Sequence, residues 1–192
     1  MNKRLKPIKL QEITSAYYKI QYFFFDHPTK NFSLNGLCLK VKISKTTANA
    51  VVEQLVKEGF LNKEVIGKLW KISCNLRHHY NATRKISYHL SLIYESNIIG
   101  AIHEIFPNAR AIILFGSYRK GDDAENSDLD IAVEVISNES PKIMELGVIP
   151  YLGYRQDIAV NLHVFSRNNI SINLFANIAN GIVLDGFLEV KL

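Results

Sequence analysis

Two aspartates, Asp128 and Asp130, are separated by one residue at the head of an apolar segment, DLDIAVEVI. Residues two apart on a strand project from one face, so these carboxylates are expected within about 7 Å of each other, from a rise of roughly 3.3 Å per residue. Carboxylates that close repel one another unless a cation lies between them. Oxygen ligands suit Mg²⁺ or Mn²⁺, which can complete their shells with water and phosphate oxygens. The pair therefore predicts a divalent-metal site.

A Gly-Ser pair just before these aspartates offers a place for phosphates. Gly116 and Ser117 directly follow ARAIILF, an apolar run that predicts a buried strand. The glycine lets the backbone approach a ligand closely, and the serine hydroxyl and nearby N–H groups can donate to phosphate oxygens. Arg119 and Lys120 add positive charge. Either feature alone is better explained by a turn with solvated acids, so only their combination favours a bound triphosphate.

The residues from Gly116 to Ile131 follow the pattern G-S-x-x-[RK]-G-x-x-x-x-x-S-D-x-D-h, where h is apolar. This pattern resembles the signature of the minimal nucleotidyltransferase domain of the DNA polymerase β superfamily, over roughly residues 98–188. The resemblance implies an α/β (α+β) fold with a mixed sheet, in which VNLHVFS forms a strand and LFANIANGIVLDG the closing helix and strand.

The same resemblance implies a reaction. A nucleoside monophosphate would move from a nucleoside triphosphate, usually ATP, to an acceptor hydroxyl with loss of pyrophosphate. In that family the two aspartates bind the metals and the Gly-Ser loop binds the β- and γ-phosphates. These roles fall here on Asp128 and Asp130, and on Gly116 and Ser117.

One position departs from the family pattern. A third carboxylate usually stands on the later strand, and the alignment of VNLHVFS places Asn161 there. Asp157 lies four residues away, about 13 Å along a strand, which is too far to replace it without a bulge. An asparagine can offer a carbonyl oxygen to a metal but cannot take a proton. His163 shares the face of Asn161, and a role as base or a role in packing or phosphate contact are both open.

Charge is unevenly distributed along the chain. The first 90 residues hold 16 Lys and Arg against 5 Asp and Glu, whereas the remaining residues hold 7 against 13. This asymmetry indicates a basic part suited to a polyanion and an acidic part suited to divalent cations. Two solvated surfaces without charged partners would give the same count.

Apolar periodicity in the basic part predicts three helices and a hairpin. ITSAYYKIQYFFF predicts a buried first helix, ended by DHPTKN, and SLNGLCLKV predicts a short second one. Ser44 is the expected N-cap of a third helix that ends at Gly59. FLNKEVIGKLWKISC predicts two strands folded back at Gly67 and Lys68. The expected inward stripe of the third helix consists of Ala48, Val51, Val52, Leu55 and Val56.

This order of elements resembles a winged helix-turn-helix domain over roughly residues 10–75. The resemblance implies that Lys45, Thr46 and Asn49 face the major groove of double-stranded DNA and that Lys68, at the wing tip, meets phosphates. Binding to protein, or a purely structural role, stays open for this part. The aromatic residues of the first helix are expected in the core and in contacts of a possible homodimer.

A helical segment is expected to join the two parts. NLRHHYNATRKISYHLSLIYESNIIGAIHEIF has a long helical pattern that only Gly100 interrupts and that ends near Pro107. The expected organisation is a winged-helix domain at 1–75, a connecting helical segment at 76–106 and a nucleotidyltransferase domain at 107–192. The histidines of the connection, at 78, 79, 89 and 103, are interpreted as surface or packing residues.

The remaining composition excludes several classes of protein. Cys38 and Cys74 lie far apart without a CxxC spacing, which argues against a disulfide framework or a zinc site. No run approaches the roughly 18 apolar residues of a membrane span, and the segment MNKRLKPIKLQEI lacks an apolar stretch typical of a signal peptide. A cytoplasmic protein without membrane contact is expected.

Three functions from different classes therefore stay open. The first is an active nucleotidyltransferase whose winged helix docks DNA or the acceptor. The second is a DNA-binding transcriptional regulator whose degenerate nucleotidyltransferase domain senses nucleotide, which Asn161 and the basic first part favour. The third is an interaction module, such as the antitoxin-like half of a pair, in which neither activity matters.

Overall fold

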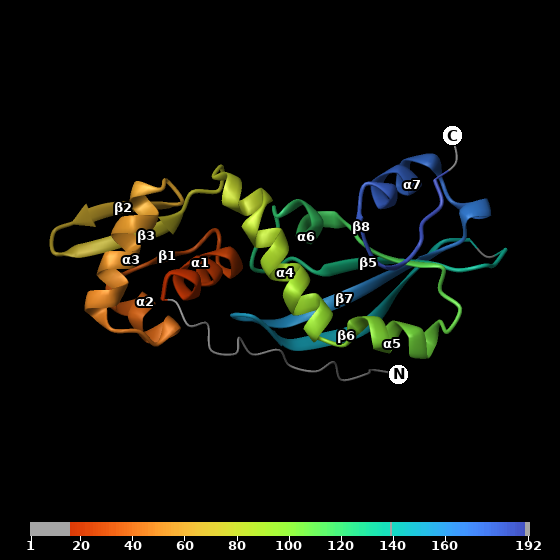
Figure 1. The fold of residues 1–192 in the computed structure, drawn as a ribbon, viewed down its shortest axis with the longest axis horizontal. Helices are drawn as coiled ribbons and strands as arrows, with labels where there is room; N and C mark the ends of the chain where they lie inside the picture. Colours follow the sequence, from red (N-terminus) through yellow and green to blue (C-terminus); the bar gives the residue numbers. More distant parts are fainter. Residues whose placement is uncertain (1–15, 139, 191–192) are drawn as a thin grey trace.

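The computed structural model describes residues 16–138 and 140–190 and places three helices and a small sheet first (Figure 1). The predicted hairpin is present, with Ile66 paired to Leu69 around the expected turn at Gly67 and Lys68. The predicted start of the first helix, at 13–15, and the segment MNKRLKPIKLQEI lie outside the described residues. The elements are α1 (Ala16–Asp26), β1 (Asn31–Phe32), α2 (Leu34–Val41), α3 (Lys45–Lys57), β2 (Leu61–Ile66) and β3 (Leu69–Cys74), with sheet order β1-β3-β2.

Local signals explain where α3 begins and ends. The Ser44 side chain accepts a hydrogen bond from the Thr47 N–H at 3.1 Å, which satisfies one of the free donors of the first turn. The chain leaves the helix through Gly59, whose φ of 82° falls where glycine carries no steric cost. Ala48, Val52 and Leu55 are fully buried, as the predicted stripe requires. Val51 and Val56 are half-buried.

The connecting segment corrects one expectation. Instead of one long helix it contains a short 3-10 turn (His79–Ala82), α4 (Arg84–Glu95) and α5 (Ile98–Ile105). The break lies at Asn97, which adopts a left-handed conformation with φ 61°, and Gly100 stands inside α5. Ser96 stabilises the break, because its hydroxyl donates to the Ile93 carbonyl at 2.7 Å and accepts from the Ile98 N–H at 3.3 Å. A local side-chain bond thus competes with helix continuation.

The second half of the chain forms a five-stranded mixed sheet with order β6-β7-β5-β4-β8. Only the β5–β7 pair is parallel, and the other three pairs are antiparallel. The long β6–β7 hairpin was not predicted, whereas the strand that contains VNLHVFS and the closing helix and strand were. The elements are β4 (Ala111–Leu114), α6 (Gly116–Lys120), β5 (Leu129–Glu134), β6 (Lys142–Leu152), β7 (Arg155–Phe165), a 3-10 turn (Arg167–Asn169), α7 (Ile172–Ala179) and β8 (Ile182–Gly186).

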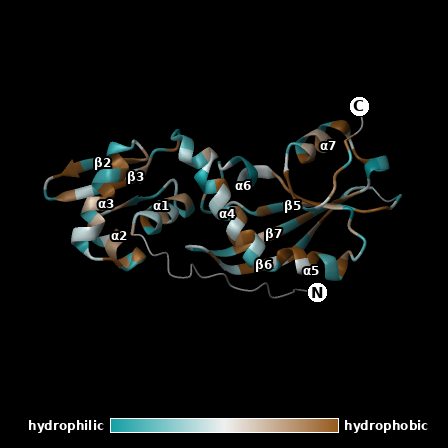
Figure 2. Cartoon of the chain, in the orientation of Figure 1, coloured by the Kyte–Doolittle hydropathy of each residue, from teal (hydrophilic) through white to brown (hydrophobic). Residues whose placement is uncertain are grey.

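Alternation along β4 gives each face of this sheet its own core. Ile112 and Leu114 belong to a cluster that also contains apolar residues of α4 and α5, whereas Ala111 and Ile113 belong to a second cluster with Ile178 of α7. The first cluster continues into α1, α2 and α3, so apolar packing joins the two halves of the chain. Figure 2 shows apolar residues on the helices that border the sheet. Across the described ranges, no helix combines the length and apolar character that a membrane span needs.

Candidate functional site

The two predicted aspartates lie at the start of β5, and each contacts a side chain of the neighbouring strand β7. The Asn161 amide nitrogen donates to Asp128 Oδ2 at 3.3 Å. His163 Nε2 lies 3.2 Å from Asp130 Oδ1. Asp128 is exposed, whereas the Asp130 side chain keeps 31% of its accessible surface. Both carboxylates therefore project to one face, and both already have hydrogen-bond partners on β7.

The register of the parallel strands explains these contacts. Asp130 is paired with Asn161 in the β5–β7 ladder, and residues two apart share a face. Asn161 and His163 therefore lie beside the aspartates, at the place where the family pattern leads one to expect a carboxylate. Asp157 is exposed and has a left-handed φ of 52°. Within residues 16–138 and 140–190, no hydrogen bond or ion pair joins Asp157 to either aspartate.

Gly116 closes the other side of the site. It begins α6 directly after β4 and has a φ of 72°, a conformation that residues with a side chain rarely adopt. A Cβ atom at this position would lie 2.9 Å from Asp130 Oδ2, closer than real Cβ contacts allow. The Phe115 N–H donates to the Asp130 carbonyl at 3.2 Å, and the Phe115 ring meets the His163 ring edge-on at 4.8 Å between centroids. The Gly-Ser turn and Asp130 are therefore neighbours in space.

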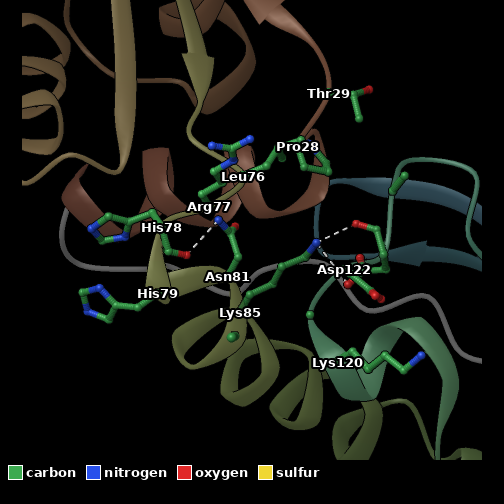
Figure 3. Close-up of a pocket in the computed structure, with 14 residues that line it drawn as sticks. Pro28, Thr29, Leu76, Arg77, His78, His79, Asn81, Lys85, Lys120 and Asp122 are labelled. Carbon is green, nitrogen blue, oxygen red and sulfur yellow. Dashed lines mark hydrogen bonds and ion pairs between the residues drawn. The ribbon is translucent and has the colours of Figure 1, made fainter.

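The two basic residues of α6 lie beyond this turn. Ser117 and Arg119 are half-buried on α6, and Lys120 ends that helix. Lys120 also lines a separate cavity of about 300 Å³ between the two halves of the chain (Figure 3). Arg77 and Lys85 line the same cavity from the β3–α4 side. Gly116 therefore lies beside Asp130, whereas Lys120 also lines the separate cavity.

The donor set can be tested against a divalent metal ion. Asp128 and Asp130 supply two carboxylates on one face, and Asn161 adds an amide oxygen if its side chain turns. No group of three or more His, Cys, Asp or Glu suited to a metal occurs among the residues that the structure describes. A pair of carboxylates fits Mg²⁺ or Mn²⁺ bound together with substrate phosphates, which needs only one or two protein carboxylates. It does not fit an ion held by protein ligands alone.

The residues predicted to bind DNA lie at the far end of the molecule from this sheet. Lys45 and Asn49 on α3 and Lys68 on the β2–β3 turn line one hollow of about 240 Å³. The start of α2 and Trp70 complete its wall. Thr46 is exposed on α3 next to Lys45. The structure thus brings three of the four residues to one hollow.

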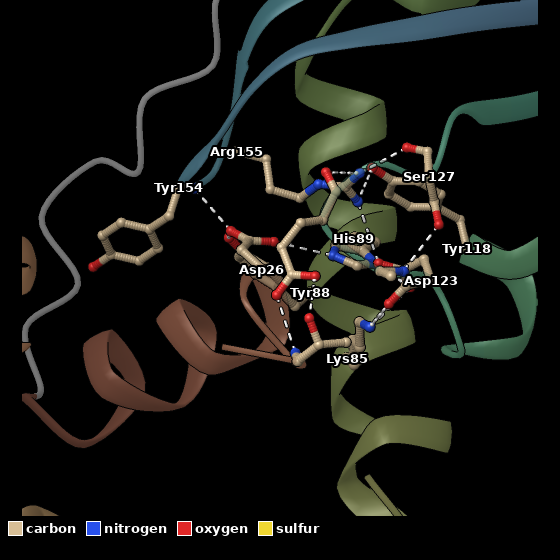
Figure 4. A network of polar contacts seen from close by, with 12 residues as sticks. Asp26, Lys85, Tyr88, His89, Tyr118, Asp123, Ser127, Tyr154 and Arg155 are labelled. Carbon is tan, nitrogen blue, oxygen red and sulfur yellow. Dashed lines mark hydrogen bonds and ion pairs between the residues drawn. The ribbon is translucent and has the colours of Figure 1, made fainter. Parts of the chain in front are cut away.

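A buried network of charged residues was missed in the sequence (Figure 4). Asp26 at the end of α1 accepts hydrogen bonds from the Tyr88 hydroxyl at 2.6 Å and from the Tyr154 N–H at 2.7 Å. His89 Nε2 lies 3.3 Å from Asp26 Oδ1. The network continues to Asp123, whose Oδ1 lies 3.7 Å from His89 Nδ1. Its only sequence signal is the placement of single charged residues inside apolar segments, such as Asp26 after three phenylalanines.

Asp123 connects this network to the loop that precedes the candidate site. Lys85 Nζ lies 3.0 Å from Asp123 Oδ1, and Arg155 Nη1 lies 3.3 Å from Asp123 Oδ2. All three side chains are at most 3% exposed. Buried opposite charges in such proximity offset one another's loss of hydration, whereas a single buried charge left alone would be costly. The cluster therefore holds α4, β7 and the loop together.

Comparison with known proteins bears on the second half of the chain. Residues 97–184 match the family described as Polymerase beta, Nucleotidyltransferase. The matched range contains Gly116, Ser117, Asp128, Asp130 and Asn161 and supports the nucleotidyltransferase part of the predicted resemblance. It begins after the three N-terminal helices and the hairpin. A search of curated proteins finds no match to the chain.

Proposed function

We propose that the protein is a metal-dependent nucleotidyltransferase that moves a nucleoside monophosphate from a nucleoside triphosphate, with ATP as the expected donor, to an acceptor hydroxyl. The close approach of Gly116 to Asp130 carries this proposal, because the Gly-Ser turn, which we propose to bind phosphates, lies directly beside the paired carboxylates. The family match over residues 97–184 supports the same reading.

Each residue of the site has a distinct role in this proposal. Asp128 and Asp130 hold Mg²⁺ or Mn²⁺, while Gly116 and Ser117 offer backbone N–H groups and a hydroxyl to the phosphates. Arg119 and Lys120 add positive charge toward the outer phosphates. When bound, the ion supplies charge stabilisation to the phosphate and the attacking oxygen. The protein's own contribution is to position the reactants and to exclude alternative geometries.

Proton removal from the acceptor is the weak step of the proposed reaction. Asn161 cannot accept a proton, and it stands beside Asp128 where a carboxylate would help to activate the hydroxyl. His163 can accept one, but its Nε2 already lies 3.2 Å from Asp130. A general base typically contributes about 10² to 10⁴-fold to a rate, so slow transfer is expected. Nucleotide binding is expected to depend less on this position.

The contacts from β7 favour a second candidate function. Asn161 and His163 stand beside the two aspartates and neither is a carboxylate, so the site can bind a nucleotide while turning it over slowly. A DNA-binding transcriptional regulator that senses nucleotide would use it in this way. Measured turnover separates the candidates, since a sensor binds ATP without forming pyrophosphate.

We further propose that residues 1–75 form a winged-helix domain that binds double-stranded DNA or a protein partner. Lys45 and Asn49 support this proposal by their place at the start of α3, and Lys68 by its place across the hollow. Thr46 is exposed beside them. Residues 76–106 would connect this domain to a nucleotidyltransferase domain at 107–192, and exposed Tyr18 on α1 would be available to a homodimer.

Isothermal titration with a non-hydrolysable ATP analogue, with and without Mg²⁺, tests the proposed site. The variant with both Asp128→Ala and Asp130→Ala should lose metal-dependent binding while its circular dichroism stays unchanged. Asp157→Asn is the matched control and should bind as the wild type does. Equal binding by the double variant would remove the metal site from the proposal. A transfer assay with labelled ATP and cell lysate then identifies the acceptor class.

A further inference from the structure

The loop between α6 and β5, residues 121–127, leads into Asp128 without a helix or strand of its own. Three distant side chains hold it. Arg155 at the start of β7 and Lys85 on α4 contact it from the buried network (Figure 4). Thr29, after α1, donates to the Glu125 carboxylate through its N–H at 3.0 Å and its hydroxyl at 2.8 Å. The position of the loop is therefore set by long-range contacts.

Arg155 makes the most extensive of these contacts. Its Nη2 donates to the carbonyl oxygens of Glu125 at 2.9 Å and Ser127 at 2.6 Å. Its Nη1 pairs with Asp123 at 3.3 Å and also bonds the Tyr118 hydroxyl. A guanidinium presents its donors in a rigid planar fork, so these acceptors are fixed relative to one another. The side chain is 3% exposed, and solvent therefore competes little with the bonds.

The bond to Ser127 acts directly on the candidate metal ligand. The Ser127 carbonyl belongs to the peptide unit whose nitrogen is that of Asp128, and a peptide unit is planar. Holding that oxygen therefore fixes the plane in which the Asp128 backbone begins. Six residues after Arg155 on the same strand, Asn161 contacts the Asp128 side chain. One strand thus holds both the backbone before Asp128 and its carboxylate.

We propose that Arg155 is a positioning residue for Asp128, which it orients through the Ser127 carbonyl for binding of a divalent cation with a nucleotide. This inference rests on the proposed function, in which Asp128 is a metal ligand. Neutralising Asp123 does not account for Arg155, because Lys85 already pairs with that carboxylate at 3.0 Å. Two of the guanidinium's bonds go instead to backbone carbonyls of the loop.

The test compares Arg155→Lys with Arg167→Lys. Lysine keeps the charge but lacks the fork, so Asp123 retains its partner while the two carbonyls lose their shared donor. Arg167 provides a matched control, because it follows β7 at its other end and pairs with Glu134 at 2.9 Å. Binding of Mn²⁺ in the presence of a non-hydrolysable ATP analogue is measured by electron paramagnetic resonance. Arg155→Lys should weaken it about 10- to 100-fold, the usual effect of disturbing groups behind metal ligands.

A second readout needs no metal. The backbone amide resonances of Asp128 and Asp130 should shift or broaden in ¹⁵N spectra of Arg155→Lys and stay in place in Arg167→Lys. Tyr118→Phe, which removes one contact of the guanidinium, is the milder variant if Arg155→Lys does not fold, and it should weaken Mn²⁺ binding in the same direction.

Two results would overturn the inference for different reasons. Unchanged Mn²⁺ binding and unchanged amide resonances in a folded Arg155→Lys protein would show that Asp128 is positioned without Arg155, while the proposed function would stand. Failure of the wild type to bind Mn²⁺ with the ATP analogue would overturn the proposed function, and the positioning role with it.

Discussion

The Tyr88 hydroxyl on α4 donates to Asp26 Oδ2 at the end of α1 across 2.6 Å, and both side chains are buried. The bond joins residues 62 positions apart in the chain. Burial and the nearby carboxylate together raise the pKa of Tyr88 well above its ordinary value, so the phenol stays protonated and remains a donor. The N–H of Tyr154 donates to the same carboxylate oxygen at 2.7 Å. Asp26 therefore fastens α1 both to α4 and to the turn between β6 and β7.

Replacing Asp26 by alanine should lower the free energy of unfolding by about 2–6 kcal/mol, from roughly 1–3 kcal/mol for each of two donors left without an acceptor. The loss arises because the Tyr88 hydroxyl and the Tyr154 N–H would be buried without an acceptor. Urea unfolding followed by circular dichroism measures the change. Asp157→Asn, at an exposed position whose left-handed backbone asparagine also tolerates, is the control and should stay within about 0.5 kcal/mol of the wild type. A comparably small effect of Asp26→Ala would show that water replaces the carboxylate.

The two cysteines should differ in their reaction with a thiol reagent. Burial raises the pKa of the Cys74 thiol to about 11, so little thiolate forms near neutral pH. Cys38 is half-buried on α2 and more accessible. Ellman's reagent at pH 8 should therefore modify one thiol quickly in the native protein and the second only after denaturation. Cys38→Ser should remove the fast phase, and Cys74→Ser should leave it; the reverse assignment would contradict the burial.

His27 should make the protein less stable in mild acid. Burial lowers the pKa of its imidazole below the ordinary 6.5, although a bond to the Phe23 carbonyl at 2.9 Å acts in the opposite sense. The unfolded chain then binds a proton near pH 6.5, before the folded protein does. Its contribution to stability is complete above this pH and declines as the pH falls from 6.5 toward the lower folded pKa. Urea unfolding at pH 7.5 and 5.5 should show a smaller difference for His27→Gln than for the wild type.

Lysines on α3 and the β2–β3 turn should give salt-dependent binding to duplex DNA if the winged-helix proposal holds. Lys45→Gln combined with Lys68→Gln removes two charges from one hollow and should lower the slope of log affinity against log salt by about 2. Lys57→Gln, at the opposite end of α3, is the matched control and should leave the slope unchanged. Fluorescence anisotropy with the full chain measures both. No binding of the wild type at low salt would exclude DNA as the partner of this part.

Local patterns were sufficient to predict α3, the hairpin turn and the shared face of the aspartates. Each depends on interactions within a few residues, such as the Ser44 cap or the alternation along β5. The position of Asn161 beside Asp128 was also predictable, since alternation and the family pattern together set the register of β7.

Contacts between distant segments were not predictable in the same way. The buried network joins Asp26, His89, Asp123 and Arg155, and no periodicity in the sequence links these positions. The helix break at Asn97 was missed because the apolar pattern continues through it, while the Ser96 hydroxyl bonds decide the local conformation. The partners of Asp123 become apparent only once α4, β7 and the loop are placed in space.

Asn161→Asp is the most direct test of whether the site is an enzyme limited by one missing carboxylate. An aspartate at this place would stand beside Asp128, where the Asn161 amide now donates at 3.3 Å, and it could bind the ion and assist proton removal. Transfer from labelled ATP, or self-modification, should rise by up to about 10² to 10⁴-fold with Mg²⁺ or Mn²⁺. Without metal the added charge should lower stability, because three carboxylates would then crowd one face. Asp157→Asn, whose side chain is exposed and apart from the site, should change little. Brisk turnover by the wild type that Asp157→Asn abolishes would instead identify Asp157 as the third carboxylate and eliminate the sensor hypothesis.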